Sequence, residues 1–120
     1  MIKKKFFVGK IKDYQKNKGW FFGHFMDKGL LKCDLVEVAF QDISGKKSKP
    51  SDKHFHKKSV EVNIVISGRV KFVIDGEKVE AGKGDFWVVY PCSVVESFQA
   101  GQNTKLVVIK TPSLDKDKFN

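Results

Sequence analysis

Two histidines and a glutamate stand at a spacing that suits a metal ion. His54 and His56 flank one residue in the run H-F-H, and Glu61 follows five residues later. In an extended strand, residues i and i+2 point to the same face, about 6–7 Å apart at the backbone. Two imidazoles and one carboxylate form a facial triad that binds Fe(II), Mn(II), Ni(II) or Zn(II). The alternative is that both histidines are exposed loop residues among the neighbouring lysines.

Short β-strands are predicted to position this group. Glycines recur along the chain between stretches rich in Val, Ile and Phe, which is typical of an all-β sandwich or barrel. No window shows a clean helical stripe with caps. The predicted strands are 20–26, 35–40, 60–67, 69–74, 77–80, 86–90 and 105–110.

Three of these segments carry particular expectations. In 60–67, Glu61 and Asn63 share one face, and Val and Ile occupy the other. Asp75-Gly76 predicts a hairpin turn, because both residues tolerate a positive φ. The continuous apolar run 86–90 predicts a strand that is buried on both faces.

Composition restricts the partners. The net charge is +9, and 22 of the 23 basic residues are lysine. Because proteins that bind nucleic acids favour arginine, we expect no nucleic-acid partner. No apolar run approaches the roughly 20 residues of a membrane span, and no export signal follows the first lysines, so we expect a cytoplasmic protein without a membrane partner.

Cys33 and Cys92 are expected to be buried free thiols, with one disulfide as the alternative.

The larger pattern resembles the cupin superfamily. Its first motif, roughly G-x5-H-x-H-x3,4-E-x6-G, is similar to His54-x-His56-x4-Glu61-x6-Gly68, with the leading glycine displaced. Its second motif is degenerate here, beginning at Gly84 and continuing past Pro91. The resemblance covers about residues 35–110. It implies an all-β fold, a single cupin-type antiparallel jelly-roll β-barrel over residues 1–120. Segment 6–26 is then expected on the barrel or at the interface of a homodimer.

The second motif normally supplies one more ligand, and two residues compete for that position. Counting from Gly84 gives Val95, and counting from Pro91 gives Glu96. We favour Glu96, which would make the metal ligands His54, His56, Glu61 and Glu96. With Val95 inward, three ligands would remain and the metal would be held weakly or not at all.

The resemblance implies a function with two alternatives. The first is a metal-binding cupin that acts on a small anionic or oxygen-rich molecule, a carboxylate or a sugar derivative, as an oxygenase, isomerase or lyase. The six lysines between 46 and 58 would border the mouth of its barrel and attract an anion. The second is a metal-free cupin that binds a sugar-like ligand or isomerises or epimerises a sugar nucleotide. Its candidate catalytic residues include His24, Tyr14 and Tyr90.

Overall fold

The computed structural model describes residues 6–27, 29–49 and 52–119, which are mostly β-structure. A short 3₁₀ helix, η1 (Ile11–Asn17), precedes the strands. The strands are β1 (Trp20–Phe22), β2 (Glu37–Asp42), β3 (Phe55–His56), β4 (Val60–Ser67), β5 (Arg69–Ile74), β6 (Glu77–Gly82), β7 (Phe86–Val89), β8 (Val95–Ala100), β9 (Lys105–Thr111) and β10 (Lys118–Phe119). Within these ranges, no helix has the length and apolar character needed to cross a membrane.

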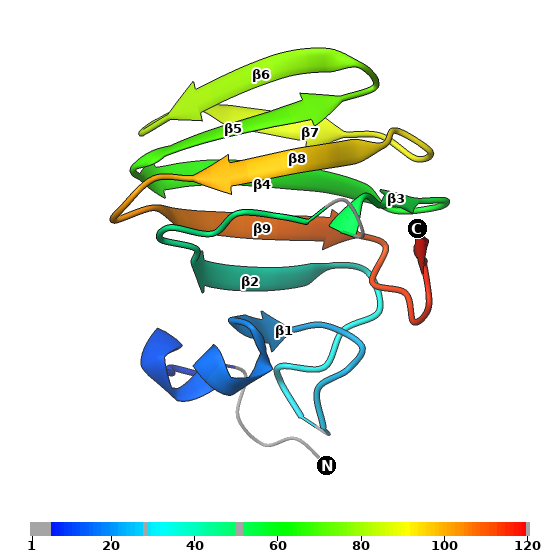
Figure 1. Ribbon diagram of the computed structural model, residues 1–120. Coiled ribbons are helices and arrows are strands. Elements are labelled where there is room, and N and C mark those ends of the chain that lie inside the picture. The colour runs from blue at the N-terminus through cyan, green and yellow to red at the C-terminus, as the bar shows by residue number, and fades with distance from the viewer. Residues whose placement is uncertain (1–5, 28, 50–51, 120) are drawn as a thin grey trace.

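The strands form two sheets and one additional pair (Figure 1). One sheet has five strands in the order β1-β2-β9-β4-β7, the other has three in the order β6-β5-β8, and β10 pairs with β3. The pairings are antiparallel. Figure 1 shows η1 and β1 beyond β2, at one end of the five-stranded sheet. The predicted all-β jelly-roll architecture is confirmed.

The apolar core lies where the two sheets meet. Phe72 of β5 contacts Trp87 of β7 and Phe98 of β8, with ring centroids 4.7 and 5.8 Å away. Because side chains alternate between the faces of a strand, each strand gives every second residue to this interior. The buried core residues are Ala39, Ile43, Val65, Val70, Phe72, Ala81, Leu106 and Val108.

Element boundaries follow the sequence pattern closely in the centre of the chain. β4 and β5 have the predicted limits, and Asp75 (φ 48°) and Gly76 (φ 83°) form the predicted turn. The first strand ends at Phe22, earlier than expected. β8 is absent from the predicted strands because Ser97, with φ 58°, interrupts its alternation.

Two predictions of burial are wrong for the single chain. Phe86 is 68% exposed and Tyr90 is 65% exposed, so segment 86–90 is not covered on both faces. Cys92 is exposed at a turn, while Cys33 is half-buried, and both are free thiols.

We predict that Gly68→Ala destabilises the fold more than Gly76→Ala. Both glycines have φ near +80°, which costs alanine about 1 kcal/mol. A Cβ at Gly68 would also lie 2.6 Å from Thr104 Cα, whereas a Cβ at Gly76 meets nothing within 4 Å. The overlap with Thr104 adds roughly 1–3 kcal/mol. Urea unfolding of both variants measures the difference. Equal losses of unfolding free energy would contradict the steric overlap between a Cβ at position 68 and Thr104.

Candidate functional site

A row of charged side chains crosses the interior of the five-stranded sheet. Glu37 of β2 is opposite Lys110 of β9, and Lys110 is opposite Glu61 of β4. Directly paired residues project from the same face of a sheet. This is the interior face, since Glu37 is buried and the exposed fractions of the Lys110 and Glu61 side chains are only 17% and 15%. Charges inside a barrel require partners, and neighbouring side chains supply them here.

Glu61 is held as an ionised carboxylate. Asn63 Nδ2 donates a hydrogen bond of 2.9 Å to its Oε1, while Lys110 Nζ lies 3.9 Å and His56 Nε2 lies 3.5 Å from Oε2. Burial alone raises the pKa of this carboxyl, but these three neighbours outweigh burial and lower the pKa to about 2. Glu61 is therefore an anion throughout the physiological pH range.

His56 is fixed in place by the C-terminal strand. β10 pairs with the strand that carries His56, and the rings of Phe55 and Phe119 stack with centroids 5.6 Å apart. The Asp117 carboxylate accepts a hydrogen bond of 2.9 Å from the Ser59 N–H, which ties the C-terminal segment to the start of β4. His56 is 5% exposed, and its buried Nε2 has no hydrogen-bond partner.

His54 lies beside His56 with its ring turned nearly perpendicular. The ring centroids are 5.5 Å apart, as the H-x-H spacing predicts. His54 Nδ1 lies 3.0 Å from the Asp52 carbonyl oxygen, which can only accept, so Nδ1 carries the proton and Nε2 keeps its lone pair. Burial is the main cause that lowers the pKa of His54, so this imidazole is neutral at pH 7.

His24 belongs to a second polar group at the other end of the charged row. Its Nδ1 lies 2.6 Å from Ser113 Oγ, and its backbone N–H donates to the same oxygen over 2.9 Å. Ser113 Oγ in turn donates to Glu37 Oε2 over 3.3 Å. His24 therefore anchors the loop after β1 to the segment after β9.

The structure does not place Glu96 with the histidines. Its carboxylate is 3.2 Å from Lys53 Nζ, in a surface pocket of about 310 Å³ that Lys47 and Lys49 also line. Val95 instead packs against the core, and its backbone exchanges two hydrogen bonds with that of His54. The position next to His54 is thus occupied by an apolar residue.

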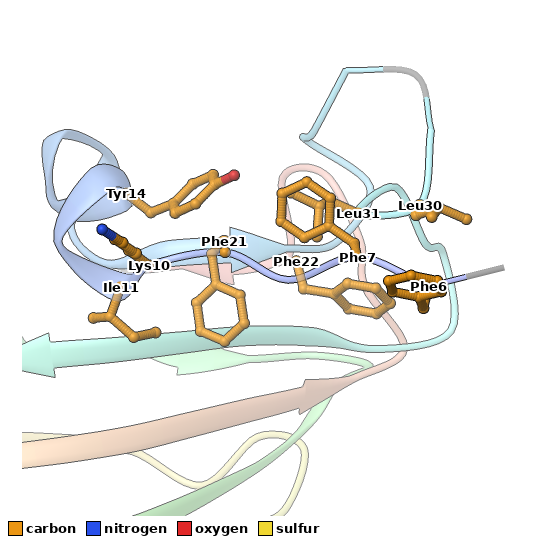
Figure 2. Close-up of a pocket in the computed structure, with 10 residues that line it drawn as sticks. Phe6, Phe7, Lys10, Ile11, Tyr14, Phe21, Phe22, Leu30 and Leu31 are labelled. Atoms are coloured by element: carbon orange, nitrogen blue, oxygen red, sulfur yellow. The ribbon is translucent and has the colours of Figure 1, made fainter. Parts of the chain in front are cut away.

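The two candidate tyrosines lie outside this group. Tyr14 is on η1 and lines a pocket of about 400 Å³ with aromatic and aliphatic residues of the N-terminal segment. Figure 2 shows Tyr14 above Phe21, with Phe6, Phe7 and Phe22 farther along the pocket. Tyr90 follows β7 and is largely exposed.

The fit of a metal ion to these residues is incomplete. The donor types are suitable, because His54 and His56 are imidazoles and Glu61 is an anion. However, Lys110 already neutralises Glu61, and Val95 supplies no donor. Over residues 6–27, 29–49 and 52–119, no three His, Cys, Asp or Glu side chains are arranged to hold a metal ion.

Several residues of the site are not found by sequence reasoning. Lys110 ends the apolar run K-L-V-V-I-K and has the pattern of an exposed strand end, yet its ammonium lies inside, 5.0 Å from the centre of the Trp20 ring. Asn63 is predicted to share a face with Glu61, and that alternation is the one signal that could have placed it in the site. Asp117 lies in a polar tail that carries no motif.

The chain belongs to the cupin family. The family model described as "Cupin domain" matches residues 41–108, which is more than half of the chain. No functionally curated protein has a significant sequence match. The family assignment confirms the resemblance carried by the histidine motif.

Solved structures with this fold include proteins of different kinds. Pac13, a nucleoside dehydratase, has a TM-score of 0.60 and 20% identity, over 72% of this chain and 68% of that chain. Another structure of Pac13, from Streptomyces, contains uridine. KdgF from Halomonas sp. has a TM-score of 0.57 and 17% identity, over 68% of this chain and 73% of that chain. A cupin protein from Bacteroides fragilis has a TM-score of 0.55 and 24% identity, over 68% and 70% of the two chains. At these identities, the likeness establishes the fold alone.

We predict that Glu61→Gln removes a pH-dependent part of the stability. Because the pKa of Glu61 is lowered to about 2, the carboxylate stabilises the fold above its ordinary pKa of 4.5, and this contribution is lost as the pH falls toward 2. Relative to the wild type, the free energy of unfolding of the variant should be lower by on the order of 3 kcal/mol at pH 7. At pH 2 the two proteins should be almost equally stable.

Denaturant unfolding between pH 2 and 7 measures this loss. Glu80→Gln is the matched control, because Glu80 forms only exposed ion pairs with Arg69 and Lys71 and should cost less than about 1 kcal/mol. If Glu61→Gln and the control gave the same pH profile, the buried Glu61 carboxylate would not have the role assigned to it.

Proposed function

We propose that the interior cluster formed by His54, His56, Glu61, Asn63 and Lys110 binds a small, oxygen-rich anionic molecule, a sugar derivative or a carboxylate. One observation carries this proposal: His56 Nε2, which is buried and unpartnered, and the Lys110 ammonium both lie within 4 Å of the ionised Glu61 carboxylate. Such a cluster offers a cation, an anion and an imidazole to one ligand. Buried polar groups of this kind are stabilised when a ligand completes their hydrogen bonds.

The preference for an anion follows from the local charges. Lys118 is paired with His56 across β10 and β3, so two ammonium groups, Lys110 and Lys118, lie near one carboxylate, Glu61. Burial is the main cause of the lowered pKa of Lys118, and repulsion from Lys110 lowers it further. An anionic ligand would relieve that repulsion.

The site has the groups needed for proton transfer. His54 is neutral with a lone pair on Nε2, and a neutral imidazole accepts a proton near pH 7. Lys110 and Asn63 are donors that can hold the oxygens of a substrate. The similarity to a nucleoside dehydratase supports a sugar-bearing substrate and a reaction that moves a proton, such as dehydration or isomerisation.

A divalent metal held by His54, His56 and Glu61 is the second candidate. The unpartnered Nε2 of His56 and the free lone pair of His54 favour it. Fe, Mn, Ni or Zn would supply Lewis-acid chemistry to a bound oxygen. In that state Lys110 would have to release Glu61. Three residue ligands would leave a coordination position for the substrate.

Three further expectations remain predictions from the sequence. They are a single cupin domain over residues 1–120, a cytoplasmic location and a homodimer.

Ligand binding is tested by calorimetric titration with a uronate, uridine and neutral glucose. We expect the uronate to bind more tightly than glucose, and we expect Lys110→Met to remove that preference and His56→Asn to weaken all binding at least tenfold. Glu80→Gln, in an exposed ion pair on the three-stranded sheet, is the control and should bind normally. The proposal fails if none of these compounds binds, or if binding is unchanged in both site variants.

The metal candidate is tested by elemental analysis of protein purified without chelators. A metal site predicts about one metal per chain and none in a His54→Ala, His56→Ala double variant. If neither protein holds a metal after reconstitution with each of the four ions, the second candidate is wrong and the metal-free site remains.

A further inference from the structure

A second pocket, separate from the interior cluster, lies in the N-terminal region of the chain. Figure 2 shows it between η1 and the loop that follows β1. Its lining residues lie between positions 6 and 31, whereas those of the interior cluster lie between positions 54 and 110. Its volume of about 400 Å³ is within the usual range of small-molecule sites. The pocket is therefore large enough to hold a ligand of its own.

Hydrogen bonds hold the two side walls of this N-terminal pocket in place. On one side, Gln15 Nε2 donates to the Phe40 carbonyl oxygen over 3.3 Å, which ties η1 to β2. On the other side, the Gly23 N–H donates to the Leu31 carbonyl oxygen over 3.1 Å. Lys32 Nζ donates to two carbonyl oxygens of the same loop, over 2.6 and 3.3 Å. The walls are thus fixed by contacts within the chain, and the pocket is formed before any ligand arrives.

The lining of the N-terminal pocket is apolar with two exceptions. Aromatic and aliphatic side chains form most of it, and Phe6 and Phe7 are 71% and 52% exposed. Among the lining residues, which all belong to the part of the chain that the structure describes, Lys10 alone carries a charge and Tyr14 alone carries a hydroxyl. Binding sites for small molecules have this composition, a mainly apolar wall with a few polar groups that orient the ligand.

The two polar residues lie at one end of the N-terminal pocket. Figure 2 shows Lys10 and Tyr14 at the end formed by η1, and Phe6 and Leu30 at the opposite end. No acidic side chain in the described part of the chain forms an ion pair with Lys10. The net charge of +9 also attracts anions to the molecule. The pocket therefore offers a cation at one end and an apolar surface at the other.

We propose that the N-terminal pocket binds a monocarboxylate with an aromatic or medium-length aliphatic tail. The carboxylate pairs with the Lys10 ammonium and accepts a hydrogen bond from the Tyr14 hydroxyl. The tail lies along Phe22 and Leu31 toward Leu30, where it removes apolar surface from water. Such a ligand differs from the oxygen-rich molecule assigned to the interior cluster, because most of its contacts are apolar. The two sites are therefore independent.

Calorimetric titration of the full chain with phenylhexanoate and with the neutral alcohol phenylhexanol tests this inference. We expect the carboxylate to bind about tenfold more tightly than the alcohol, because only the carboxylate pairs with Lys10. Lys10→Met should remove this preference by weakening phenylhexanoate alone. Lys12→Met is the matched control, since it removes the same charge from a residue of η1 that does not line the pocket, and it should preserve the preference.

Phe7→Ala tests the apolar wall and should weaken both compounds about tenfold, while Val8→Ala, at an exposed neighbour outside the lining, should bind them normally. Circular dichroism verifies that each variant is folded.

Three outcomes would overturn the inference. The first is a wild-type chain that binds neither compound. The second is a loss of phenylhexanoate binding in Lys110→Met but not in Lys10→Met, which would place the compound in the interior cluster. The third is an affinity that falls as the protein concentration rises, which would show that a second copy of the chain fills the pocket.

Discussion

The ionised carboxylate of Glu61 lies inside the barrel, and a buried charge raises the free energy of a fold by several kcal/mol unless partners surround it. Those partners come from different segments: His56 from β3, Asn63 from β4 itself and Lys110 from β9. The contacts are satisfied only when β9 is in register with β4 and β3 holds His56 beside Glu61. The site and the strand register therefore stabilise each other.

The sequence predicts those parts of the structure that local chemistry determines. The hairpin turn requires a positive φ at both positions, and Asp75 and Gly76 tolerate it, so this turn can be predicted without tertiary information. The alternation of 60–67 places Glu61 and Asn63 on one face, and the H-x-H spacing brings His54 and His56 together. Each of these inferences depends on residues within a few positions of one another.

Features that depend on register are harder to predict. Lys110 faces Glu61 only because β9 pairs with β4 at that offset, and nothing in the run K-L-V-V-I-K indicates it. The choice between Val95 and Glu96 is decided by a single residue in β8. Ser97 adopts φ 58° and shifts the register against β5, so counting from a distant glycine or proline does not determine which side chain points inward.

The alternation of side chains in β4 is the reverse of the usual pattern of a surface strand. A polar residue is usually assigned to the solvent face, yet here Glu61 and Asn63 point inward while Val62 and Ile64 point outward. Such a strand is stable only if its inward charge is partnered. Because successive side chains lie on opposite faces, a substitution at Glu61 changes the interior charge cluster, whereas one at Ile64 changes the opposite face of the sheet. A one-residue slip of β4 would turn the Glu61 carboxylate outward, away from His56 and Lys110.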